Sequence, residues 1–517
     1  MRRFRRGITE LAAFGLLYLA IALQGAWPVP DVNEPHYVGK MIAFWNPSWV
    51  QNDPFLSSAD AHPIFYAVFG WPSRFLEAES FTWLARAVGW LLVAGGWYVF
   101  ARQLLPSPWA AMLSGLLFGL LQERFNMAGE WVIGGIEAKV PAYGFVFFGL
   151  AALVRGWWNI AFVSLGLASA FHVLAGGWAL IAAVMTWLIY NRREISFWQI
   201  VPGGAIGCLL AFPNVMAALR LSWGVEPEVL REAYQIYLYR LGHHLSVFRI
   251  PSGALDRFLL LTFLWYLLQP MLQRGEAHQI LRIFVLSSLG IAGVGGLLSL
   301  LELINAELAA TLLRYYLFRL ADVMVPAAVA IAGGKIILAY QDSGAPERRV
   351  LPFLLWCIAA IHVVYCGYSR LAARMPRADE NQVEDYDAWR DVCRWVATSD
   401  KVPEGSRFLT PRTSYTFRWY ARRADVVNWK DIPQDAPAIV RWWHTLCKVH
   451  AYRDATGRLR WLPNLAYAGA ERLQKVAREV GAEFAIAPTW PPLDLPILYK
   501  NETYAVYHLT QPAESPR

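Results

Sequence analysis

The chain has 517 residues, of which 56% are hydrophobic, 15% aromatic and only 17% charged. This composition excludes an ordinary water-soluble protein and indicates an integral membrane protein. The formal net charge of +8 does not indicate a nucleic-acid partner, because many arginines lie beside hydrophobic segments, where membrane topology explains them.

Eleven membrane-spanning helices are predicted, because each needs a run of roughly 20 mostly apolar residues, or fewer when it is buried among others. The first run follows a basic start and resembles a secretory signal, but it is long and lacks a small-residue cleavage site, so we expect an uncleaved helix. The boundaries within 158–190 can be drawn in more than one way. The predicted spans are 8–26, 81–103, 108–122, 140–154, 158–172, 174–190, 197–217, 256–272, 281–301, 316–338 and 350–368.

The positive charges between these spans predict the orientation of the chain. Short basic turns, with Arg102, Arg155 and Arg193 among their residues, belong on the cytoplasmic side. The N-terminus is then cytoplasmic, and an odd number of spans places the region after the last one on the extracytoplasmic side. We therefore predict a multi-pass protein of the bacterial inner membrane.

The first outer loop, 27–80, contains a charged and turn-prone segment, Asp31–Tyr37. Asp31 and Glu34 are candidate catalytic carboxylates at a membrane surface, although they could also serve only to keep a loop solvated. His36 and Lys40 are candidate substrate-binding residues. Apolar residues at helical spacing predict two helices that lie in the membrane interface after this segment.

Two further polar segments are predicted on the same side of the membrane. Glu137 and Lys139 follow a Gly-Gly pair between the third and fourth spans. Charge at the edge of the hydrocarbon needs a partner, so a salt bridge and a substrate contact are both compatible with the pattern. His172 ends the fifth span, where a packing role and a substrate contact are again both open.

The outer segment 218–255 contains Arg240 and the adjacent pair His243 and His244. Adjacent residues of a helix point in different directions, so the two histidines make a poor metal clamp and suit hydrogen bonds to a phosphate or a sugar. Near the tenth span lie three ionisable residues, which such a hydrophobic setting marks as functional candidates. Arg319 and Asp322 are spaced to pair on one helical face, which leaves Arg314 to meet an anionic phosphate.

From about residue 373 the charge rises and long apolar runs end. Alternating strand and helix patterns predict a small extracytoplasmic α/β domain, 373–517, after a transmembrane domain, 1–372. Cys393 and Cys447 both fall in this domain, so a disulfide between them is possible. Metal-ligand spacings are not found in the sequence, so we expect neither a metal nor another cofactor.

These polar segments suit transfer from a lipid-linked sugar phosphate. Such a reaction needs a carboxylate to take a proton from the acceptor and cations to hold the departing phosphate. A transporter or flippase of a lipid-linked or anionic substrate is the main alternative, although the ionisable groups gather on one side rather than across the bilayer. A non-catalytic envelope protein is the third.

The plan resembles the GT-C superfamily of membrane glycosyltransferases. The matching pieces are Asp31–Glu34, the interfacial helices after it, and Arg319–Asp322 near a late span. Segments such as Asn-Glu-Pro-His-Tyr and Gly-Gly-Ile-Glu-Ala-Lys also resemble an uncharacterised bacterial membrane family. The resemblance implies an α-helical polytopic fold, an inverting reaction, a polyprenyl-phosphate sugar donor, and a glycan, lipid or protein acceptor. It leaves the base unassigned between Asp31 and Glu34.

Overall fold

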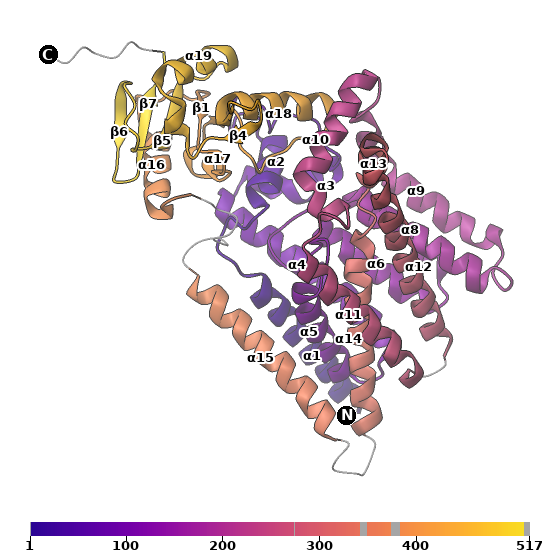
Figure 1. The fold of residues 1–517 in the computed structure, drawn as a ribbon. Helices are drawn as coiled ribbons and strands as arrows, with labels where there is room; N and C mark the ends of the chain where they lie inside the picture. Colours follow the sequence, from indigo (N-terminus) through magenta and orange to yellow (C-terminus); the bar gives the residue numbers. More distant parts are fainter. Residues whose placement is uncertain (1, 273–274, 342–348, 374–382, 511–517) are drawn as a thin grey trace.

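The computed structural model describes residues 2–272, 275–341, 349–373 and 383–510 (Figure 1). Every predicted span coincides with a helix. These helices are α1 (Arg2–Gly25), α4 (Ala78–Leu104), α5 (Pro108–Arg124), α6 (Lys139–Leu153), α7 (Trp158–Phe171), α8 (Val173–Thr186), α9 (Phe197–Arg220), α11 (Ser252–Leu268), α12 (Glu276–Ser299), α14 (Arg319–Gln341) and α15 (Val350–Ala372). Among the described residues, seven helices are long and apolar enough to cross a membrane, while α6 and α7 are shorter apolar helices.

The short helix α6 lies inside the bundle and packs against α4 and α7. A Cβ atom added at Gly96 of α4 would lie 2.3 Å from the carbonyl oxygen of Gly144 in α6. The two backbones therefore meet without intervening side chains, as small residues allow between membrane helices. Such close burial suits α6 to lie among other helices although it has only 15 residues.

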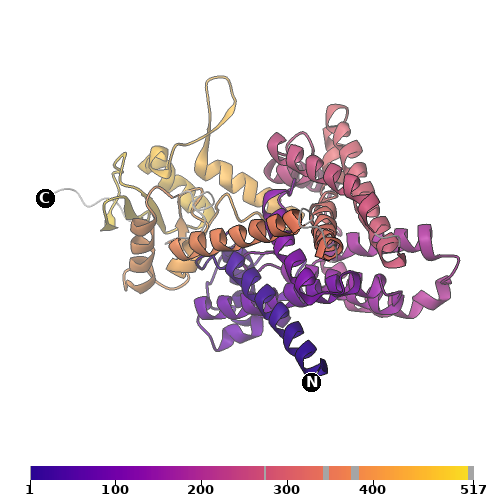
Figure 2. The same ribbon diagram turned by 90° about the horizontal axis from the view of Figure 1, so that it is seen from below.

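The polar outer segments form helices at one end of the bundle, away from the N-terminus (Figure 1). The predicted interfacial helices of the first loop are α2 (Glu34–Trp45) and α3 (Pro63–Gly70). They are joined at this end by α10 (Pro227–Leu245) and α13 (Ala306–Leu313). The view from below shows the C-terminal region beside this end of the bundle (Figure 2).

The C-terminal region is the predicted α/β unit, and its centre is a mixed sheet of order β2-β1-β5-β7-β6. Strand β1 is parallel to β2 and β5, whereas β5, β7 and β6 are antiparallel. A hairpin of β3 and β4 lies apart from it. The elements are α16 (Tyr386–Thr398), β1 (Arg407–Leu409), α17 (Phe417–Ala421), β2 (Ala424–Asp425), α18 (Ala436–His450), β3 (Ala451–Arg453), β4 (Leu459–Trp461), α19 (Ala470–Val480), β5 (Phe484–Pro488), β6 (Ile497–Lys500) and β7 (Tyr504–His508).

Helices cover both faces of this sheet. Phe484 and Ile486 of β5 pack toward α16, while the alternate residues Ala485 and Ala487 pack into the core shared with α18 and α19. The possible disulfide is therefore wrong, because Cys393 and Cys447 lie on helices that cover opposite faces. All five cysteines of the chain are free.

The α/β unit is joined to the first outer loop by a buried ionic cluster. Arg418 of α17 bonds to Asp53 of the loop and to Asp431, and it lies 3.9 Å from Asp425. Asn52 also donates a hydrogen bond of 3.1 Å to the carbonyl of Gly405. Helix α15 ends at Ala372 and residues 374–382 lie outside the described part, so the domain boundary near 373 stays a prediction.

Candidate active site

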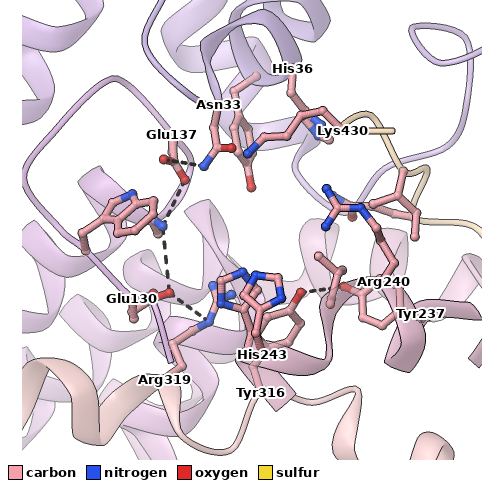
Figure 3. Close-up of a pocket in the computed structure, with 18 of the residues that line it drawn as sticks. Asn33, His36, Glu130, Glu137, Tyr237, Arg240, His243, Tyr316, Arg319 and Lys430 are labelled. Carbon is pink, nitrogen blue, oxygen red and sulfur yellow. Dashed lines mark hydrogen bonds and ion pairs between the residues drawn. The ribbon is translucent and has the colours of Figure 1, made fainter. Parts of the chain in front are cut away.

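A cavity of about 620 Å³ lies between the helical bundle and the α/β unit (Figure 3). Its walls come from the first outer loop, the segment 126–139, helix α10, the start of α14 and the loops at 413–434. The polar and aromatic lining residues are Asn33, His36, Tyr37, Asn126, Glu130, Trp131, Glu137, Lys139, Tyr237, Arg240, His243, His244, Tyr316, Arg319, Thr413, Tyr415, Trp429, Lys430 and Gln434.

One wall is a chain of alternating charges. Lys139 Nζ lies 3.1 Å from Glu137 Oε2 and 4.0 Å from Glu130 Oε2, and Arg319 Nε lies 3.4 Å from the same Glu130 oxygen. Asn33 donates a hydrogen bond of 2.9 Å to the other oxygen of Glu137. Figure 3 shows Asn33, Glu137, Glu130 and Arg319 along one side of the cavity. Lys139 and Arg319 are the first residues of α6 and α14, so the two cations stand at the ends of apolar helices.

Asp322 supports this wall from behind. Its carboxylate accepts backbone hydrogen bonds from Met127 at 2.7 Å and from Ala128 at 2.8 Å, which fixes the loop that carries Glu130. The predicted pairing of Arg319 with Asp322 is wrong, because the backbone amides take up the carboxylate and Arg319 turns toward Glu130.

The opposite wall carries Arg240 and Lys430, from α10 and the α/β unit (Figure 3). Arg240 Nε donates a hydrogen bond of 3.0 Å to the carbonyl of Trp429, and its guanidinium lies 4.8 Å from the centre of that ring. The contact joins α10 to the α/β unit across the cavity rim. The two parts of the chain therefore complete one site.

The histidine pair lines the cavity, and its predicted contact with a substrate stays a prediction. The rings of His243 and His244 lie 3.9 Å apart, and His244 Nδ1 contacts the carbonyl of Ala128. Burial lowers the pKa of His244 well below its ordinary value, so this ring is neutral near pH 7. Gly129 has a φ of +71°, and a Cβ there would lie 2.9 Å from the His244 ring.

Glu34 was expected to face the substrate, but the structure places it elsewhere. It is fully buried, and Arg86 of α4 binds both of its oxygens at 2.7 and 2.6 Å. The amide of Ile136 donates a further hydrogen bond of 2.9 Å. Glu34 does not line the cavity, because one arginine and backbone amides occupy its carboxylate.

Asp31 is also outside the cavity lining. Its carboxylate accepts a hydrogen bond of 3.0 Å from the amide of Gly135 and one of 2.8 Å from Val32. A Cβ at Gly135 would lie 2.8 Å from Glu34 Oε1 and 2.9 Å from Asp31 Cβ. Gly135 is therefore needed for close approach to the acidic segment.

The remaining predicted residues are divided between the cavity and its surroundings. His36 lines it, with Nδ1 at 3.8 Å from Asp431 Oδ1. His172 lies behind the wall, where its Nε2 contacts Arg319 at 2.8 Å. Lys40 lies outside and donates a hydrogen bond of 2.7 Å to the carbonyl of Ser58.

Arg314 also lies outside the cavity lining. Its guanidinium is 4.0 Å from the ring centre of Tyr234 and 4.7 Å from that of Tyr315. These cation–π contacts account for the arginine that the spacing left without an intrahelical partner. Of the two arginines near the tenth span, Arg319 alone is a lining residue.

Sequence reasoning missed several lining residues. Glu130 precedes the Gly-Gly pair by only four residues, and its charge at a hydrocarbon edge was the available signal. Tyr237 and Tyr316, whose hydroxyls lie 3.0 Å apart, each lie within five residues of a predicted arginine. Lys430 and Gln434 gave no local signal. Within the described ranges, one side-chain group of metal-ligand type is found, Glu123, His362 and Cys366, and it lies away from these lining residues.

Comparisons with known proteins identify the class of fold. The model of a domain of unknown function (DUF6798) matches residues 387–449, and no curated protein matches the chain. ArnT from Cupriavidus metallidurans bound to undecaprenyl phosphate is similar over 100% of both chains, with 14% identity and a TM-score of 0.50. The same protein in the apo state gives 13% identity and a TM-score of 0.51, again over 100% of both chains. The predicted GT-C fold is confirmed.

Arabinofuranosyltransferase AftD from Mycobacteria is also similar, with 14% identity and a TM-score of 0.47. The match covers 99% of this chain and 40% of AftD. On the likeness to ArnT, the chain is an α-helical polytopic membrane protein of the GT-C fold with a small α/β unit at its C-terminal end.

Proposed function

We propose that this chain is a membrane glycosyltransferase that moves a sugar from a polyprenyl-phosphate donor to an envelope acceptor with inversion at the anomeric carbon. The observation that carries the proposal is the charged wall of Glu137, Lys139, Glu130 and Arg319, which lies at the membrane edge of a closed-in cavity in a GT-C fold. The volume of about 620 Å³ is typical of sites for small molecules.

The charges of the cavity suit a phosphate. The described lining residues include four arginines and lysines, Lys139, Arg240, Arg319 and Lys430, against two glutamates. Guanidinium and ammonium groups bind phosphate oxygens through charge-assisted hydrogen bonds and stabilise the charge that develops as the glycosidic bond breaks. Arg319 and Lys139 are the phosphate ligands in this proposal, because they begin membrane helices. The solved ArnT structure that contains undecaprenyl phosphate supports a lipid phosphate ligand here.

Glu137 is the carboxylate best placed to act as the base. Burial raises its pKa, but Lys139 and Asn33 outweigh burial and hold the pKa below its ordinary value, so the group is ionised near pH 7. It would accept the proton of an acceptor hydroxyl or amine as that atom attacks the anomeric carbon, while the bonding electrons leave with the phosphate. Asp31 is the second candidate, since it contacts the amide of Gly135 in the same loop.

The acceptor approaches from the α/β side in this proposal, where Lys430 and Gln434 line the cavity. A glycan, a lipid or a protein acceptor each offers the required hydroxyl or amine. No metal or organic cofactor takes part in the proposed transfer, since the cationic side chains hold the leaving phosphate.

Mass spectrometry of envelope glycans tests this function in a deletion strain complemented with variants. We expect the deletion to remove a sugar modification, Asp31→Asn to restore it, and Glu137→Gln to fail at an unchanged protein level. The opposite result would assign the base to Asp31. A deletion strain with an unchanged glycan profile would refute the glycosyltransferase.

We also propose that the N-terminus is cytoplasmic and that the α/β unit lies outside the bacterial inner membrane. Reporter fusions after Arg193 and Pro411 should then give opposite orientations. Arg193 lies in the turn between α8 and α9, whereas Pro411 follows β1 of the α/β unit. Fusions that report the same side would overturn this orientation.

A further inference from the structure

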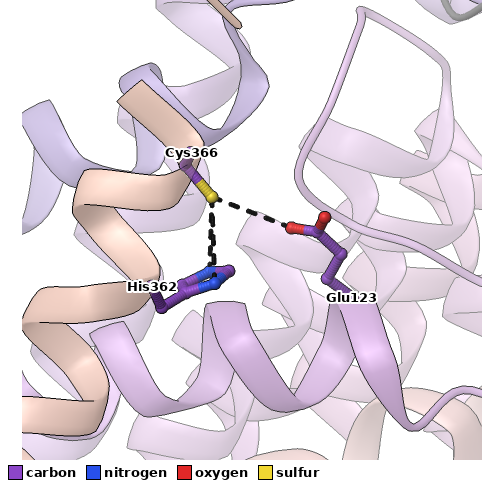
Figure 4. Close-up of side chains that lie close together, drawn as sticks. All are labelled: Glu123, His362 and Cys366. Carbon is purple, nitrogen blue, oxygen red and sulfur yellow. Dashed lines mark hydrogen bonds between the residues drawn. The ribbon is translucent and has the colours of Figure 1, made fainter. Parts of the chain in front are cut away.

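A cluster of three different ligand types lies at the outer end of the bundle, apart from the cavity. Glu123 lies in the last turn of α5, and His362 and Cys366 lie one turn apart on α15 (Figure 4). Residues four apart share a face of a helix, so both side chains point toward α5. His362 is 5% exposed and Cys366 is 1% exposed.

The separations suit a shared metal ion. Cys366 Sγ lies 3.6 Å from His362 Nε2, 3.8 Å from Nδ1 and 4.0 Å from Glu123 Oε2. One ligand atom from each residue can be chosen so that all lie within 4.8 Å of one another. Bonds of roughly 2.3 Å to sulfur and 2.0–2.1 Å to nitrogen in a tetrahedral site put ligand atoms about 3.5 Å apart.

A second observation is the small void beside the ligands. A space of about 10 Å³ is bounded by Gln24, His362 and Cys366 together with apolar residues of α1 and α5. This is close to the room that one water molecule or one ion requires. Two of the three ligands, His362 and Cys366, line this void, so there is room for one small ion or water molecule beside them.

The carboxylate of Glu123 is already oriented by neighbours. Arg370 Nη2 lies 3.2 Å from Oε1, which leaves Oε2 facing the thiol, and Gln24 Nε2 donates to Oε2 at 3.1 Å. Partners of this kind fix the direction of a metal ligand and are a regular feature of built metal sites.

We propose that Glu123, His362 and Cys366 bind one Zn²⁺ ion that holds α15 against α5. The combination of thiolate, imidazole and carboxylate is typical of zinc. Binding forms a sulfur–zinc bond and releases the thiol proton to solvent. The ion clamps the last span to the end of α5, three residues before Asn126 of the cavity, so the site stabilises the support of the cavity wall.

Zinc content of the full-length, untagged protein tests the proposal. The protein is purified in detergent, stripped with a chelator, incubated with ZnSO₄ and desalted before elemental analysis. We expect about one zinc per chain, as a single three-ligand site predicts. Cys366→Ser and His362→Gln should lose it, while the matched control Cys357→Ser on the same helix should retain it.

Cobalt substitution gives a second measurement, whose wild-type result alone can refute the site. A cobalt thiolate has an intense near-ultraviolet charge-transfer band, so wild-type protein loaded with CoCl₂ should show the band and Cys366→Ser should not. The site would be overturned if wild-type protein retained no zinc and lacked the cobalt band. It would also be overturned if wild type and Cys366→Ser retained equal amounts of zinc. Neither readout depends on glycosyl transfer.

Discussion

Arg86 of α4 binds both carboxylate oxygens of Glu34 at 2.7 and 2.6 Å, and neither side chain has any exposed surface. The pair connects the first outer loop to a membrane span and leaves the carboxylate no open face. Glu34 is therefore an anchor of the loop in this structure, and the residues that it positions, Asn33 and His36, line the cavity.

Glu34→Ala should destabilise the protein strongly, by about 3–5 kcal/mol, because it leaves Arg86 as an unpaired charge in a buried place. Thermal unfolding, monitored by tryptophan fluorescence, measures this loss of stability. The control is Glu228→Ala, whose ion pair with Arg231 is solvent-exposed and contributes little. A Glu34→Ala protein as stable as wild type but inactive would instead support the predicted role of Glu34 as base.

Arg319→Gln should weaken binding of a polyprenyl phosphate by about 10- to 100-fold, as expected from the loss of one hydrogen bond to a charged group. Fluorescence quenching or calorimetry with short-chain polyprenyl phosphate measures the affinity. Arg314→Gln is the matched control, since Arg314 stacks on Tyr234 and Tyr315 outside the cavity and should bind the lipid as wild type does. A larger loss for Arg314 than for Arg319 would contradict the placement of the phosphate.

His36 should make stability depend on pH. Burial lowers its pKa to about 4, against 6.5 for an unperturbed histidine, although nearby Asp431 partly opposes this. The folded pKa of His36 lies below the unfolded value, so the unfolded state takes up a proton more readily. The stability that comes from burying the neutral ring is therefore present above about pH 6.5 and is lost as the pH falls toward 4.

Unfolding midpoints measured between about pH 7 and pH 5 should therefore fall less steeply in His36→Gln than in wild type, because one proton uptake on unfolding is removed. His444→Gln is the control, since that side chain is 63% exposed. Equal slopes for wild type and His36→Gln would show that His36 titrates alike in both states.

Arg418→Met should loosen the α/β unit from the membrane part. The substitution leaves Asp53, Asp425 and Asp431 buried without their shared cation, a change that costs about 3–5 kcal/mol. Limited proteolysis should release the C-terminal region faster than in wild type. Arg422→Met is the control, because Arg422 stacks on Trp49 and takes no part in the ionic cluster of Arg418. Unchanged proteolysis of Arg418→Met would show that other contacts hold the unit.

The helices were predictable because their signals are local. Runs of apolar residues gave the spans, and alternating strand and helix patterns after about residue 373 gave the α/β class of the C-terminal region, although helix α18 was not predicted. The pair Gly134–Gly135 was also recognisable from the sequence as a turn. The reason for glycine at Gly135 was not predictable, because it is a tertiary contact: Asp31 and Glu34 lie within 3 Å of the position that a Cβ atom at Gly135 would take.

The candidate site was predictable only in part, because pairing depends on which helices become neighbours. Glu34 and Arg86 are 52 residues apart, and the sequence gave no reason to join them. Lys139 and Arg319 were found because charge at a membrane edge is costly, and Arg240 was found because it lies near the histidine pair in an outer polar segment. Lys430 was missed because a surface-type lysine in a polar region carries no such signal until the fold brings it to the cavity.

The cavity has walls that come from separate stretches of the chain. Under the proposed function, a homologous chain that kept Lys139 and Arg319 but carried different residues at 413–434 would recognise the same kind of lipid carrier and a different recipient. Acceptor choice can then diverge through the α/β unit alone, and hybrids that exchange this stretch are the direct route to enzymes with new recipients.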